Sequence, residues 1–129
     1  MPTTTAMTNT LESALINLIL NGTGYTAGQV TYIGILSAAG SDSAQTEMSG
    51  SSRQAIAFGA STSGSAVTNT GAITFTNSGW GSTSVYGVGF YTAASSGTCL
   101  LYGNFDSVVT VASTQSLQFN IAGITISMD

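Results

Sequence analysis

The sequence has almost no basic side chains. Arg53 is the only one among 129 residues, since lysine and histidine are absent, and the formal net charge at pH 7 is -4. A protein that binds nucleic acid neutralises several phosphates with cations, so this composition excludes nucleic acid as a partner. The usual base beside a serine or cysteine nucleophile is histidine, and its absence argues against acyl transfer. We expect a protein that is not an enzyme.

Cysteine and long apolar runs are also scarce. Cys99 is the only cysteine, so no disulfide can form within the chain. It lies in a strand-like run, where a small buried side chain is the expected role. The first residues lack the cationic region of a signal peptide, and no apolar run approaches the length of a membrane span. The sequence therefore predicts no membrane partner, and a protein that is made and used without secretion.

Charged residues make up only 5% of the chain, against roughly 25% in ordinary globular proteins. Serine, threonine, asparagine, glutamine and glycine must therefore supply the polar surface. A mean hydropathy of +0.33 argues against intrinsic disorder. A folded surface with so little charge is poorly protected against association, so an oligomer or a lattice is its expected setting.

One amphipathic helix is expected over residues 9–20. Apolar residues recur there with helical spacing, at Leu11, Ala14, Leu15, Leu18 and Ile19. Asn9 is the expected N-cap, with Glu12 reaching back in a capping-box arrangement. Asn21 and Gly22 supply the expected left-handed end of the helix.

The rest of the chain has the period of β-strands. Alternating β-branched and aromatic residues predict strands over residues 30–37, 54–58, 72–76, 84–91, 99–102, 108–111, 116–119 and 124–127. Such spacing favours an antiparallel β-sandwich or jelly-roll-like barrel, mainly β with one N-terminal α-helix. We expect an N-terminal arm over residues 1–8 and a single domain over 9–129, with no internal repeat. The loop 38–52 is the longest irregular stretch.

No catalytic, cofactor or metal site is predicted. Asp42, Glu47 and Asp106 are the carboxylates available in the body of the fold, and nothing in their spacing places two of them across a cleft. No run of oxygen ligands resembles a calcium loop. Glycines 87 and 89 lie inside a predicted strand and open no helix, so close packing or a bulge is a better explanation than phosphate binding.

Arg53 and Trp80 are more informative. The lone guanidinium of Arg53 carries five donors and can anchor the long loop to backbone carbonyls, to Asp42 or to Glu47; contact with a ligand is the alternative. Trp80 follows a turn, and it serves either as part of the core or as an exposed contact aromatic.

The order of these segments resembles a family of small virion structural proteins of tailed bacteriophages. Members are often labelled tail fibre protein, and some act as capsid cement or decoration proteins. The segments that carry the resemblance are Leu20–Tyr25, Val30–Ser37, Arg53–Phe58, Asn69–Phe75, Gly87–Gly97, Leu100–Gly103 and Phe119–Ile126. Gly50, Ser51 and Ser52 precede Arg53 where the family usually has an aromatic residue two positions before the arginine.

The resemblance implies a non-enzymatic subunit that is made in the host cytoplasm and placed in the virion. Our first hypothesis is a capsid decoration protein on the capsid surface, which binds the major capsid protein and copies of itself, as a homotrimer, and stabilises the shell. The second is a tail fibre or baseplate component that contacts the host surface or its glycans with Trp80, Tyr86 or Tyr91. The third, least favoured, is a carbohydrate-active enzyme.

Overall fold

Antiparallel β-strands dominate the structure, and one helix stands near the N-terminus. This computed structural model describes residues 2–61 and 66–127. The fold class predicted from the sequence is confirmed. The segment expected to be an N-terminal arm contains a strand, β1 (Pro2–Met7), which pairs with the main sheet. Met1, at the start of that segment, lies outside the described residues, as do 62–65, 128 and 129 of the predicted domain.

The main sheet has five antiparallel strands in the order β1-β7-β6-β2-β3. Besides β1, its strands are β2 (Tyr32–Leu36), β3 (Gln54–Ala55), β6 (Ser84–Tyr91) and β7 (Cys99–Thr110). The bounds of β6 are those predicted. The strands predicted over 99–102 and 108–111 are two ends of the single long strand β7, which pairs with β1 on one side and β6 on the other.

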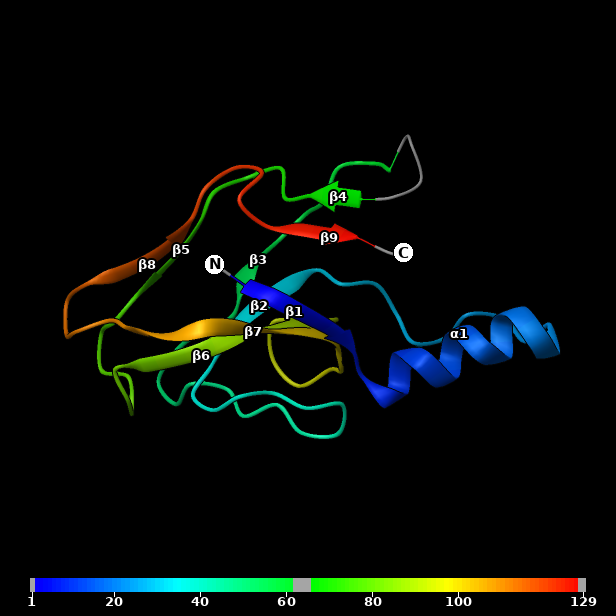
Figure 1. Cartoon of the computed structure of the whole chain (residues 1–129), viewed down its shortest axis with the longest axis horizontal. Coiled ribbons are helices and arrows are strands. Elements are labelled where there is room, and N and C mark those ends of the chain that lie inside the picture. Colours follow the sequence, from blue (N-terminus) through cyan, green and yellow to red (C-terminus); the bar gives the residue numbers. More distant parts are fainter. Residues whose placement is uncertain (1, 62–65, 128–129) are drawn as a thin grey trace.

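Two short ribbons form the second layer. Strand β4 (Ala66–Thr68), which the sequence did not predict, pairs with β9 (Thr125–Ser127), and β5 (Ile73–Thr76) pairs with β8 (Ser116–Phe119). Figure 1 shows both ribbons on the same side of the main sheet. The core lies between the layers, where Phe119 of β8 contacts Phe105 of β7 with ring centroids 6.4 Å apart.

The opposite face of the main sheet is covered by the loop between β2 and β3 (Figure 1). Backbone hydrogen bonds hold its two limbs together, from Ser37 to Thr46 and from Met48 to Ile35. The predicted loop 38–52 is therefore irregular but well attached to the sheet.

Helix α1 (Asn9–Asn21) matches the predicted helix closely, but its N-terminus is built differently. Thr8, not Asn9, is the N-cap, and it makes no side-chain cap bond; its hydroxyl donates instead to the carbonyls of Cys99 and Leu100. The prediction of a capping box is thus wrong, because the Thr8 hydroxyl bonds to the carbonyls of the neighbouring strand and not to the first turn of the helix. The predicted end is confirmed, since Gly22 adopts the left-handed conformation with φ of 64°.

Candidate functional site

Helix α1 projects from the sandwich (Figure 1), and most of its apolar side chains are exposed. An amphipathic helix normally packs its apolar face on the core, yet Leu11 in the first turn is the helix residue that is buried. The exposed fractions are 55% for Ile16, 40% for Leu18, 74% for Ile19 and 75% for Leu20. A soluble protein rarely leaves so many large apolar side chains together in water, so this helix end is a candidate interaction surface.

The apolar surface of α1 is wider than one contact needs. Beyond the first turn, polar side chains form a single row along the helix at Ser13, Asn17 and Asn21, and the amide of Asn21 donates to Asn17 at 2.8 Å. At 100° per residue, the apolar side chains are spread over roughly two thirds of the helix circumference. A helix that is apolar on most of its sides is normally buried on most of its sides.

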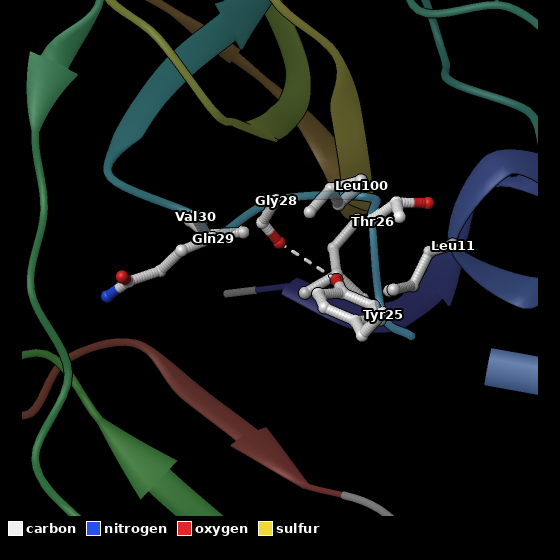
Figure 2. A pocket seen from close by; sticks show the side chains of 8 residues that line it. Leu11, Tyr25, Thr26, Gly28, Gln29, Val30 and Leu100 are labelled. Atoms are coloured by element: carbon white, nitrogen blue, oxygen red, sulfur yellow. Dashed lines mark hydrogen bonds between the residues drawn. The ribbon is translucent and has the colours of Figure 1, made fainter. Parts of the chain in front are cut away.

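A groove of about 560 Å³ opens at the base of α1 (Figure 2). Its walls come from the helix, from the segment that follows it and from β7. The lining residues are Leu11, Tyr25, Thr26, Gly28, Gln29, Val30, Leu100 and Leu101. None of them is charged. The Tyr25 hydroxyl donates to the Gly28 carbonyl at 2.9 Å, which fixes the ring at the rim of the groove.

Arg53 lies on the other face of the main sheet, and its guanidinium donates four hydrogen bonds to three residues. Its Nε and Nη2 donate to the two carboxylate oxygens of Glu47 at 2.8 and 2.7 Å. Its Nη1 donates to the carbonyls of Ala93 and Ser96 at 2.7 and 2.6 Å. The bond to Glu47 raises the pKa of Arg53 above its ordinary value. These contacts join the long loop to the turn after β6, which is the arrangement that an anchoring role requires.

Tyr91 lies beneath Arg53, whose guanidinium carbon is 3.6 Å from the centre of the ring. Only 4% of this residue is exposed, so the prediction that Tyr91 contacts a partner at the surface is wrong. Glycines make the room: a Cβ on Gly89 would stand 2.7 Å from the Tyr91 ring, and one on Gly34 would stand 3.2 Å from it. Burial raises the pKa of the Tyr91 phenol and of the half-buried Cys99 thiol.

The other two predicted contact aromatics are partly open to water. Tyr86 is exposed on β6. Trp80 is half-buried against the core, and its backbone N–H donates to the side chain of Asn77 at 3.1 Å. It also lines a polar cleft of about 250 Å³ whose other walls include Ser51, Gln54 and Thr76. Trp80 therefore packs against the core and also lines a cleft, and its contact with a partner stays a prediction.

A model of the family described as "Podophage GP4 fiber I protein gp80" matches residues 6–127. The chain belongs to this family. Its membership confirms the part of the sequence resemblance that indicated a phage structural protein, and it supports a virion-associated structural role. No curated protein matches the sequence.

In this fiber I family member, two of the carboxylates considered for catalysis bond different partners. Glu47 bonds Arg53, and Asp42 accepts a hydrogen bond of 2.7 Å from Tyr102, whose pKa that bond raises. Asp106 lies at an exposed position on β7. Within residues 2–61 and 66–127, no cluster of three or more histidine, cysteine, aspartate or glutamate side chains could hold a metal ion. In the same residues, no helix has the length and apolar character needed to cross a membrane.

The groove is the feature that sequence reasoning missed. Its lining comes from three separated segments, and the stretch after the helix has no periodicity from which a wall could be predicted. The sequence did contain one indication of an additional exposed surface. Ile16 and Leu20 lie outside the apolar stripe that the helical spacing predicts, so packing of that stripe would not cover them.

Proposed function

We propose that this protein is a non-enzymatic structural subunit of a phage particle, located in a tail fibre. The observation that carries the proposal is the projecting apolar end of α1, which is built to be covered by another protein. The description of the family, a podophage fibre protein, supports the fibre location.

The architecture supports a position at an end of the fibre. Fibrous shafts are commonly built from repeated segments, whereas this sequence has no internal repeat and folds as one sandwich. We therefore place the subunit at an end of the fibre, where it attaches to the tail or faces the host.

A host-facing end would use the cleft beside Trp80. Sugars bind proteins through an aromatic face and nearby hydroxyl and amide groups, and this cleft combines Trp80 with serine, threonine and glutamine side chains. Saturable binding of the purified protein to host cells, lost in Trp80→Ala and retained in Tyr86→Ala, would support this role. Equal binding by the two variants would contradict it.

Capsid decoration is the second candidate. Its support is the nearly uncharged surface, because a shell contact formed by serine, threonine and apolar groups avoids the cost of desolvating many charges. In that role the apolar end of α1 would bind the major capsid protein.

The hydrogen bonds of the loop carboxylates support the proposal that this protein is not an enzyme. Glu47 is engaged by Arg53 and Asp42 by Tyr102, so each already has a partner other than the water or sugar that glycoside hydrolysis would require it to activate.

Immunogold labelling of purified particles with antibodies against the whole chain tests the location. Label at the tail fibres is the expected result, and cryo-electron microscopy would then give the number of copies. Label over the head, in hundreds of copies, would replace the fibre by capsid decoration. Absence of the protein from purified particles would refute both functions.

A further inference from the structure

The apolar end of α1 and the apolar groove at its base form two halves of one contact. We propose that α1 of one copy of this chain inserts into the groove of a second copy, lined by Leu11, Tyr25, Val30 and Leu101. The inference rests on the proposed role as a particle subunit and names the partner of the exposed helix.

The groove cannot be filled by its own helix. Leu11 forms one wall, and Leu20 lies nine residues further along the same helix, about 13 Å away at 1.5 Å per residue. Because α1 is a continuous helix from Asn9 to Asn21, its end cannot fold back onto its base. A helix end that fills the groove would therefore come from another molecule.

The two surfaces match in chemistry. The groove lining has no charged side chain, and Glu12 in the first turn is the only charge on the helix. A charged partner would gain no complementary ion pair here, and each carboxylate or ammonium that it brought would lose its hydration. A second copy of the chain supplies an uncharged, apolar helix end without any further component.

The area of the contact favours insertion over simple pairing of two helices. At about 100 Å² of apolar surface per large side chain, the exposed parts of Ile16, Leu18, Ile19 and Leu20 amount to roughly 250 Å². A standard interface buries about 800 Å² on each partner. Helix-to-helix pairing alone falls far short of this area. Insertion comes closer to it, because each copy then contributes both its helix and its groove, and it places the guest helix alongside the host α1.

Insertion also accounts for the width of the apolar surface. One row of the guest helix, with Ile19, would face the groove, and the other, with Ile16 and Leu20, would face the host helix. At 100° per residue, Leu18, Ile19, Ile16 and Leu20 together span about 200° of the helix, which is wider than the roughly 100° stripe that a single flat contact covers. Each copy then gives one helix and receives one, and a closed arrangement of copies, such as a two-fold dimer or a ring, leaves no helix uncovered.

Complementation between two variants of the full-length chain tests the proposal. Leu20→Glu disables the helix and leaves the groove intact, and Thr26→Glu places a carboxylate in the groove and leaves the helix intact. Both side chains are exposed in the single subunit, so neither change should disturb its fold. Ile121→Glu is the matched control, since it adds the same charge at an apolar side chain that is 65% exposed elsewhere.

Sedimentation velocity over a wide range of concentration gives the readout. We expect the wild type and Ile121→Glu to form one discrete oligomer, and each of the other two variants to associate more weakly by about a hundredfold or more. An equimolar mixture of Leu20→Glu and Thr26→Glu should form a complex that neither forms alone, because the intact helix of one meets the intact groove of the other.

Three results would overturn the inference. A wild type that stays monomeric at all concentrations would show that another protein covers the helix. Dissociation of Leu20→Glu without dissociation of Thr26→Glu would show that helices pair outside the groove. Failure of the mixture to associate would show that the two sites are not halves of one contact. None of these would remove the protein from the particle, so the labelling experiment tests the proposed function separately.

Discussion

Replacing Arg53 tests whether the only cation of this protein anchors its longest loop. Arg53→Met keeps an unbranched apolar stem over Tyr91 but removes every hydrogen bond of the guanidinium. The carbonyl of Ala93 lies in a partly buried bond and loses its charged donor, while that of Ser96 is exposed and can turn to water. Adding the lost contact with the Tyr91 ring, we expect the free energy of unfolding to fall by about 2–4 kcal/mol.

Glu47 should matter less than Arg53. Its side chain is 38% exposed, so water can solvate much of what the ion pair loses. We expect Glu47→Gln to lower the free energy of unfolding by about 1 kcal/mol or less. Arg53→Lys separates charge from geometry, because an ammonium cannot reproduce the flat fork that reaches Glu47 and two carbonyls together; its loss should approach that of Arg53→Met.

Urea unfolding at neutral pH, followed by the fluorescence of the single tryptophan, measures all of these variants. A double-mutant cycle with Arg53→Met and Glu47→Gln isolates the energy of the pair. The reasoning is refuted if Glu47→Gln costs as much as Arg53→Met, since the carbonyl and ring contacts would then contribute nothing. It is refuted equally if Arg53→Lys is as stable as the wild type.

Two further changes probe the same face of the sheet. Tyr91→Phe keeps the ring under Arg53 and removes a buried hydroxyl that has no hydrogen-bond partner among the described residues, so the free energy of unfolding should rise by about 1 kcal/mol. Burial raises the pKa of the Tyr91 phenol in the folded state, so the stability of the wild type is retained up to the unfolded pKa of about 10 and falls as the pH rises above it. Between about pH 8 and about pH 11, the urea midpoint of Tyr91→Phe should therefore fall less than that of the wild type. A Tyr91→Phe variant that is less stable than the wild type contradicts the assignment. In Gly87→Ala the new Cβ would stand 2.2 Å from the Gly103 carbonyl oxygen, so we expect a loss of about 3 kcal/mol or failure to fold, whereas Gly71→Ala meets nothing within 4 Å and should change the free energy of unfolding little. Equal melting temperatures of these two glycine variants would rule out the close packing.

Local patterns predicted the elements whose own residues determine them. Strands β6 and β8 have the predicted bounds because clear alternation is closed at each end by turn residues. Strand β7 continues through Gly103, Asn104 and Asp106, where no alternation exists, because pairing with β1 and β6 on its two sides holds it extended. Strand β1 was missed for the same reason, since a threonine-rich segment becomes a strand only beside a partner.

The candidate site was less predictable because it depends on contacts between distant segments. Periodicity indicated that α1 has an apolar face, but it cannot tell a face packed on the same chain from one left for another chain. Likewise, nothing local places Tyr91 inside: its burial requires that Gly34 and Gly89, paired across β2 and β6, leave the ring room. The partner of Arg53 was one of two candidates from the sequence, and only the fold selects Glu47 over Asp42.

The use of the single cation constrains how subunits can recognise one another. Arg53 is occupied by Glu47, Ala93 and Ser96, so the remaining surface offers no basic side chain to a carboxylate of a second copy. Association of identical copies therefore cannot depend on ion pairs between side chains, and the acidic net charge opposes it weakly. Raising the salt concentration should leave the oligomer unchanged or strengthen it, because salt screens that repulsion and favours apolar burial. Sedimentation in low and high sodium chloride measures this, and dissociation at high salt would mean that charges outside the helix and groove hold the copies together.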